Sequence, residues 1–133
     1  MIPSAWEAVH RPEDGELVGY LAPHDDGLVV PTTLTGTPAG APDEPEAAAG
    51  LLVASGLARL ARRWWCRLPD TLPPGLLDAG GPTAHWDWRP VVLVEVSPAG
   101  CRVRPEAPTP EEGGAQASLP VPVGTLLREQ PPG

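Results

Sequence analysis

The amino-acid sequence predicts an α+β fold, a mostly antiparallel sheet of two hairpin groups with one amphipathic helix packed on it. Three observations support this class. Short apolar runs separated by turn residues fill the chain before residue 35 and after residue 62, and one run between them has helical spacing. The 20 Pro and 15 Gly among 133 residues argue against a protein of long helices. The 41% of hydrophobic residues, with five Trp, suffices for one small core.

The first hairpin group is a meander of three expected strands, at 6–10, 16–21 and 28–34. The turns between them end in Asp14-Gly15 and Asp26-Gly27, and Gly adopts positive φ in such turns without steric cost. Pro31 has no backbone N–H to donate to a neighbouring strand. It therefore predicts that the third strand lies at an edge or carries a bulge.

One helix is expected to begin near Asp43, a good N-cap residue with Glu46 three positions later. Pro45 is tolerated in a first turn, and acidic residues there favour the positive end of the helix dipole. The pair Ser55-Gly56 predicts a break in the middle of the helix. The residues that we expect to face the sheet follow helical spacing: Ala49, Val53, Leu57, Leu60 and Trp64.

The second hairpin group follows the helix. Residues 63–68 are expected to form a strand whose even-numbered side chains face the core, and residues 91–96 and 101–104 a hairpin. The expected cross-strand pairs are Val96 with Cys101, Glu95 with Arg102 and Val94 with Val103. The expected inner face is Trp64, Cys66, Val92, Val94, Val96, Cys101 and Val103.

We expect residues 1–128 to form a single small α+β domain and residues 129–133 a disordered tail. A long ordered loop is expected at 69–90, and residues 105–118, rich in Pro, Gly and Glu, are expected to be a flexible segment. Residues 119–123 alternate apolar residues with Pro, which is typical of an edge strand or a polyproline segment. A helical turn is expected at residues 125–129.

The charge of the chain narrows the function classes. Nine Arg and no Lys stand against seventeen Asp and Glu, a formal net charge of -8. Nucleic acid is therefore a disfavoured partner, and no membrane partner is expected. The first residues lack the basic start and apolar run of a secretory signal, and no apolar run is long enough to span a membrane. These features favour a cytoplasmic protein.

No motif for a metal or a cofactor is present, and we expect neither. Cys66 and Cys101 are isolated in the sequence, so they do not fit a zinc site, and we expect buried free thiols rather than a disulfide. The Gly-rich pairs at 80–81 and 113–114 lack the spacing and the Lys of a phosphate-binding loop.

The strongest candidate site is basic and aromatic. Arg beside exposed Trp binds anions, aromatic groups and acidic peptides through charge-assisted hydrogen bonds, stacking and cation–π contacts. The candidate binding residues are Arg63, Trp65, Arg67, His85, Trp86, Trp88 and Arg89. The pattern favours a non-enzymatic binding or adaptor protein with an acidic or aromatic partner, most simply another protein. The alternative is that these Arg side chains pack on Trp and neutralise the acidic first third of the chain.

Other function classes stay open. A small enzyme acting on an anionic substrate would use His85, Asp87 and Arg89, because His transfers protons near neutral pH. An acidic inhibitor would present the first third of the chain to a basic partner. Exposed strand edges near Pro31 and Val121 allow a homodimer.

Two stretches of the first third carry a resemblance. Residues 11–21, Arg-Pro-Glu-Asp-Gly-Glu-Leu-Val-Gly-Tyr-Leu, and 31–36, Pro-Thr-Thr-Leu-Thr-Gly, resemble the opening of small uncharacterised proteins from high-GC bacteria. The resemblance implies a compact α+β domain. It carries over no activity and no site residue.

Overall fold

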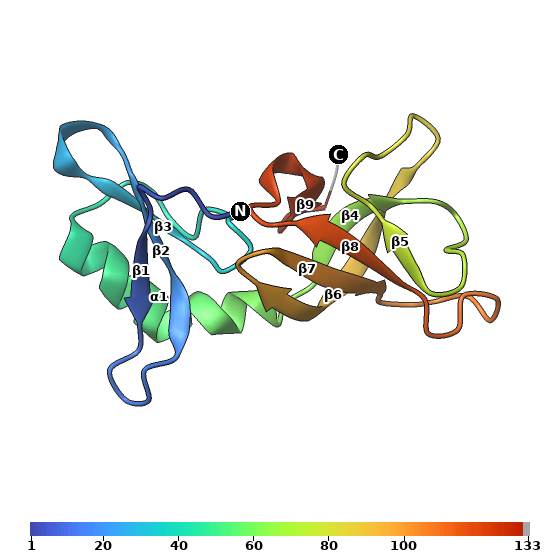
Figure 1. The fold of residues 1–133 in the computed structure, drawn as a ribbon, viewed down its shortest axis with the longest axis horizontal. Coiled ribbons are helices and arrows are strands. Elements are labelled where there is room, and N and C mark those ends of the chain that lie inside the picture. Colours follow the sequence, from blue (N-terminus) through green and yellow to red (C-terminus); the bar gives the residue numbers. More distant parts are fainter. Residues whose placement is uncertain (132–133) are drawn as a thin grey trace.

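A computed structural model describes residues 1–131. In this range it contains one α-helix and two sheets in which all strand pairs but one are antiparallel, so the predicted α+β class is confirmed. Figure 1 shows the sheets side by side as two lobes, with the helix running from the first toward the second. The expectation of a single sheet is wrong, because each hairpin group buries its own apolar face around a separate core.

The first lobe is a three-stranded meander covered by the helix. Its strands, paired in chain order, are β1 (Glu7–His10), β2 (Leu17–Pro23) and β3 (Val29–Thr32), with the short helical turn η1 (Asp25–Gly27) before β3. β3 is an edge strand, as Pro31 predicts, and the carbonyl of Pro31 accepts a hydrogen bond from the amide of Ala39. The core of this lobe consists of Val9, Val18, Leu21, Ala39, Ala48 and Leu52.

The helix α1 (Pro45–Leu60) is continuous, and the predicted break is wrong. Gly56 lies so close to β2 that an added Cβ would be 2.6 Å from the carbonyl oxygen of Val18. This close approach sets the rotation of the helix, and its buried residues are Ala48, Leu52 and Gly56. The expected face, one position later along the helix at 49, 53 and 57, is only half-buried.

The second lobe is a six-stranded sheet with the order β5-β8-β7-β6-β4-β9, in which only β5 and β8 are parallel. The predicted loop 69–90 contains β5 and the first four residues of β6. The short helical turn η2 (Gly124–Leu126) precedes the last strand, where a helical turn through 129 is expected from the sequence. The strands are β4 (Trp64–Leu68), β5 (Leu76–Asp78), β6 (Asp87–Ser97), β7 (Gly100–Pro105), β8 (Gln116–Pro120) and β9 (Leu127–Arg128).

A bulge in β6 changes the predicted register of the β6–β7 hairpin. Two predicted pairs are confirmed, Val96 with Cys101 and Glu95 with Arg102. The third is wrong: Leu93 lies opposite Val103, because the register shifts between Leu93 and Glu95 and leaves Val94 exposed. Val94 is the extra residue of this bulge, and it moves the residues that precede it in β6 to the opposite face of the sheet. Val91 is therefore buried instead of Val92.

The inner face of the second sheet surrounds the larger of the two cores. This core includes the predicted Trp64, Cys66, Cys101 and Val103. Leu68 and Leu72 are also fully buried in it. Most of the remaining side chains come from the last third of the chain: Ala115, Ala117, Leu119, Val121, Val123 and Leu127.

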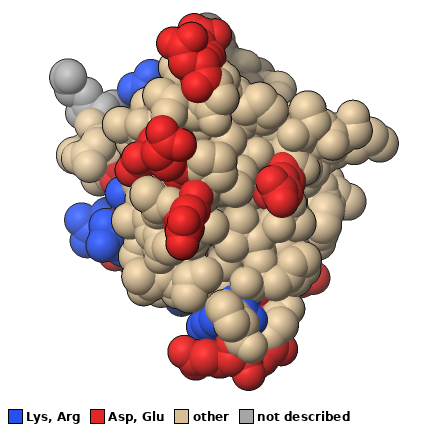
Figure 2. All heavy atoms as spheres, turned by 90° about the vertical axis from the view of Figure 1, so that its left-hand side faces the viewer, with Lys and Arg blue, Asp and Glu red and all other residues tan. Residues whose placement is uncertain are grey.

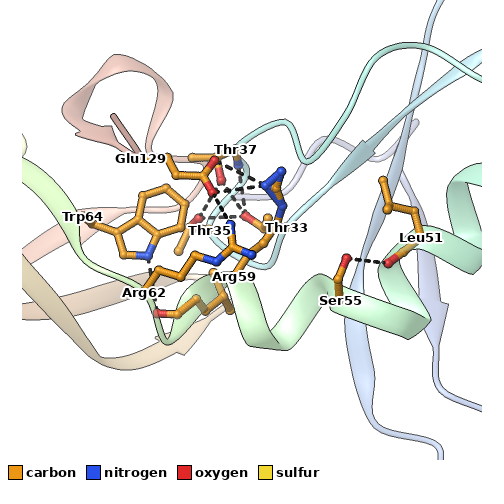
Figure 3. Close-up of polar contacts among 10 residues, drawn as sticks. Thr33, Thr35, Thr37, Leu51, Ser55, Arg59, Arg62, Trp64 and Glu129 are labelled. Atoms are coloured by element: carbon orange, nitrogen blue, oxygen red, sulfur yellow. Dashed lines mark hydrogen bonds and ion pairs between the residues drawn. The ribbon is translucent and has the colours of Figure 1, made fainter. Parts of the chain in front are cut away.

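The lobes meet at a polar junction. The hydroxyls of Thr33, Thr35 and Thr37 form a ring in which Thr33 lies 2.9 Å from Thr35 and 2.7 Å from Thr37 (Figure 3). The third side of the ring, between Thr35 and Thr37, measures 3.3 Å, and all three residues are buried. The amide of Val123 in the second lobe donates to the carbonyl of Thr35. The buried part of the junction therefore has its hydroxyl groups satisfied by one another.

Two ion pairs add to this junction. Glu129 follows β9 and accepts hydrogen bonds from Arg59 at 3.1 Å and from Arg62 at 3.3 Å, near the C-terminal end of α1 (Figure 3). The half-buried Glu129 belongs to the tail expected at 129–133, and residues 132–133 of that tail lie outside the described residues. The segment expected to be flexible at 105–118 supplies the end of β7, the start of β8 and a turn between them.

Charge is divided unevenly between the lobes. Residues 1–60 contain nine acidic residues and two Arg, whereas seven of the nine Arg follow residue 60. Figure 2 views the molecule from the first lobe and shows acidic side chains distributed over this face. Within residues 1–131, no helix has the length and apolar character needed to cross a membrane.

Candidate functional site

The ion pairs of the Arg side chains single out one place on the molecule. Six of the nine Arg pair with a carboxylate: Arg11, Arg59, Arg62, Arg63, Arg89 and Arg102. Among residues 1–131, Arg67, Arg104 and Arg128 form no ion pair. Two of these three, Arg67 and Arg128, line the same pocket. In a chain with seventeen acidic residues, such uncompensated cations mark where an anionic partner would be stabilised most.

Strand pairing explains how these residues meet. In the sheet of the second lobe, Arg67 lies opposite Trp88, and Trp65 lies opposite Pro90 on one side and Arg128 on the other. Opposed residues of neighbouring strands point to the same face. The even-numbered residues of β4 are buried in the core, as predicted, so these five share the outer face.

We name the pocket formed by Arg67, Trp88 and Arg128 the Arg/Trp site. The guanidinium carbon of Arg128 lies 4.7 Å from the centre of the Trp88 ring. Arg67 donates from Nε to the carbonyl of Trp86 at 3.3 Å and from Nη2 to the carbonyl of Thr83 at 3.1 Å. The pocket measures about 200 Å³, and its other lining residues are Ala79, Pro82, Thr125 and Leu126. Carbonyls and an aromatic ring thus hold both guanidinium groups in place without neutralising them.

The structure separates the seven candidate residues. Arg67 and Trp88 form the site, and Trp65 lies on the same face, half-buried. Arg63 is occupied by Glu106, with 2.9 Å between Nε and the carboxylate. His85 and Trp86 lie in the loop before β6. His85 is exposed, and Trp86 packs against the second core, so the loop contributes to the site through the carbonyls that hold Arg67.

Arg89 does not belong to the predicted surface. It lies opposite Cys66 and therefore on the core face of the sheet, facing away from Trp88. Its Nη1 and Nη2 donate to the two carboxylate oxygens of Glu112 at 2.7 and 2.9 Å, and Nη1 also reaches the carbonyl of Pro69 at 3.1 Å. β6 begins at Asp87 rather than at the expected residue 91, and the resulting alternation turns Arg89 inward.

Glu112 is a buried residue that sequence reasoning missed. Its carboxylate also accepts hydrogen bonds from the amides of Leu72 and Thr109, both at 2.8 Å. The hydrogen bond from Arg89 is the main cause that lowers the pKa of Glu112 to about 2, and the two amides lower it further against the effect of burial. The same bond raises the pKa of Arg89. A Glu in a Pro/Gly-rich segment carries no sequence signal of this role, which ties three segments together.

Arg128 is the second residue that was missed. It is the only cation after residue 104, and β9 has only two residues, too few for a visible alternation. The pairing of β9 with β4 brings Arg128 to the site, and no pattern within residues 125–129 indicates that pairing.

Other clusters in the described part of the chain do not form a site. A hollow of about 690 Å³ is an open depression at the β6–β7 turn, and Glu95 neutralises Arg102 there. Cys66 and Cys101 are buried free thiols, as predicted, and burial raises the pKa of Cys66 to about 12 and that of Cys101 to about 11. Among residues 1–131, no group of three or more acidic, His or Cys side chains is placed to hold a metal ion.

No protein family model, curated protein or solved structure matches this chain. The resemblance of the first third to small bacterial proteins stays a prediction. Function is therefore inferred from the chemistry of the Arg/Trp site. Two fixed guanidinium groups and an indole ring can bind an oxyanion or an aromatic group.

Proposed function

We propose that the chain is a non-enzymatic binding protein that engages an acidic segment of a protein partner through the Arg/Trp site. One observation carries this proposal: two Arg side chains without a carboxylate partner within residues 1–131 converge on one pocket, and uncharged groups hold them there. A bound carboxylate would gain charge-assisted hydrogen bonds from cations that lose little further side-chain freedom.

The size and chemistry of the pocket support binding of a single group. Sites for drug-sized ligands and cofactors usually measure about 300–1,000 Å³. At about 200 Å³ the Arg/Trp site is smaller and suits one side chain of a larger partner. Its lining contains no His, Asp, Glu, Cys or Tyr to transfer a proton, and Arg stays protonated in proteins.

The enzyme alternative gains no support from the geometry. It needs His85, Asp87 and Arg89 at one anionic substrate, and Glu112 occupies the guanidinium of Arg89 on the core face. The proposal places the binding event in the cytoplasm, because two buried free thiols are typical of a reducing compartment. The net charge of -8 opposes the nucleic-acid alternative.

The test is a binding titration at low salt with a fluorescein-labelled peptide of alternating Glu and Gly, in which the fluorescence anisotropy of the peptide reports binding. Trp88→Ala and Arg128→Ala should each weaken binding by about tenfold or more, the size of one lost charge-assisted contact. Arg104→Ala is the matched control, since it also removes an unpaired Arg from the outer face of the same sheet. The affinity of Arg104→Ala for the peptide should stay within about twofold of that of wild type, because Arg104 does not line the pocket. Absence of binding, or equal losses in Arg104→Ala and Arg128→Ala, would contradict the proposal.

A further inference from the structure

The lining of the Arg/Trp site has a charge that one carboxylate does not balance. It contains two guanidinium groups and no acidic residue, a formal charge of two. A carboxylate carries one negative charge, whereas a phosphoryl group carries about 1.5 to 2 at neutral pH. A phosphoryl group is therefore the better match for the site.

We infer that the Arg/Trp site takes a doubly charged phosphoryl group, presented on a phosphorylated side chain of the partner, in preference to a carboxylate. This inference rests on the proposed function and specifies the anchoring group.

The number of available donors supports this ligand class. A guanidinium has five N–H donors, and Arg67 uses two of them on the carbonyls of Thr83 and Trp86. The Arg128 guanidinium donates no hydrogen bond within residues 1–131 and lies over the Trp88 ring instead, so its N–H groups stay available. The three phosphoryl oxygens accept strongly and can reach both guanidinium groups together, whereas a bidentate carboxylate matches a single one.

The volume of the site agrees with the donor count. The pocket of about 200 Å³ has room for a group larger than one water molecule, which takes about 30 Å³ in the liquid. A carboxylate seated on one guanidinium would leave part of this space to water. The pocket has room for a tetrahedral phosphoryl group, and Ala79, Pro82 and Leu126 line it with apolar surface for the carbon stem.

Neighbouring charges do not cancel the positive charge of the pocket. Glu129 is next to Arg128 in the chain, but Arg59 and Arg62 pair with its carboxylate. Asp87 begins β6 opposite Leu68, whose side chain is buried in the core, and alternation places Asp87 on the face opposite to Trp88. The site is thus a positive pocket on a protein that is acidic overall.

The experiment compares three peptides that share one Gly-rich sequence and differ at a central position, which is phosphoserine, Asp or Ser. Affinities for the full chain are measured by anisotropy, with inorganic phosphate as a competitor. We expect the phosphoserine peptide to bind at least about tenfold more tightly than the Asp peptide. Arg128→Ala and Arg128→Gln should both remove this preference, and Arg104→Ala should keep it. Circular dichroism verifies that each variant is folded.

Each other outcome has a distinct meaning. Equal affinity for the phosphoserine and Asp peptides overturns the inference and leaves the proposed function intact. If neither the phosphoserine peptide nor the Asp peptide binds, both the inference and the proposed function are overturned. A preference that survives in both Arg128 variants assigns the phosphoryl group to another place and overturns the site. Inorganic phosphate that binds as tightly as the phosphoserine peptide shows a site for free phosphate, which overturns the peptide-borne source.

Discussion

Replacement of Glu112 by Gln removes the charge that holds Arg89 on the core face of the second lobe. The carboxylate is fully buried and accepts two hydrogen bonds from Arg89 and one each from the amides of Leu72 and Thr109. A Gln side chain has one acceptor oxygen and introduces two N–H donors in a place that already holds four donors. At least one of those donors would lose its partner.

The expected cost follows from the pKa of Glu112. A fall from 4.5 to about 2 corresponds to about 3 kcal/mol of stabilisation of the ionised form in the folded state. Loss of one partner from a buried ion pair costs about 3–5 kcal/mol. Because the Arg89 side chain retains 18% exposure and can regain some hydration, we expect the lower end, about 3 kcal/mol.

The assay is urea unfolding of wild type and Glu112→Gln at several pH values between about 7 and about 3, with Trp fluorescence as the readout. The pKa of Glu112 is lowered in the folded state, so its carboxylate stabilises the protein above the unfolded-state pKa. This stabilisation is lost as the pH falls from about 5 toward about 2. The difference between wild type and variant should therefore be largest near pH 7 and shrink on acidification.

The exposed pair Arg63–Glu106 provides the control. Glu106→Gln should cost less than about 1 kcal/mol, because surface ion pairs contribute little. A Glu112→Gln cost that does not change between about pH 7 and about pH 3, or one no larger than the control, would refute the role assigned to Glu112.

Two further predictions concern the packing of α1 and the junction. Gly56→Ala should lower the free energy of unfolding by about 1–3 kcal/mol, because the new Cβ would lie 2.6 Å from the Val18 carbonyl oxygen. Gly50→Ala, with no atom within 4 Å of the new Cβ, should raise it by about 1 kcal/mol; equal effects in a urea titration would contradict the packing. Thr35→Val should cost about 1–2 kcal/mol because it opens the hydroxyl ring, and the exposed Thr71→Val should be neutral by the same titration.

Local patterns predicted the fold class and much of the second sheet. Alternation along 63–68 placed Cys66 in the core, and the turn at 97–100 fixed the pairing of Val96 with Cys101. The bulge at Val94 escaped prediction because a run of apolar residues reads the same in either register. The division into two sheets also escaped, since strand patterns do not show which strands are neighbours.

The Arg/Trp site is also predicted only in part, because local sequence patterns do not show which strands are neighbours. Arg67 belongs to a strand whose period of two is visible in the sequence, whereas Trp88 falls in the expected loop 69–90, and only the strand pairing shows that the two are neighbours. Arg89 is wrongly predicted as a residue of the exposed site, because the sequence indicates a start of β6 four residues too late and leaves Arg89 in the expected loop. Arg128 and Glu112 act through partners far away in the sequence, and such contacts leave no local pattern.

Chemical labelling of the two cysteines can report when the second lobe opens. Both thiols are buried in the core of that lobe, and the first lobe contains no cysteine. A thiol reagent reacts with the thiolate, which burial and a raised pKa keep scarce in the folded state. The labelling rate of the native protein therefore measures how often the second lobe opens. Comparison of that rate with global unfolding would show whether the two lobes open together or separately.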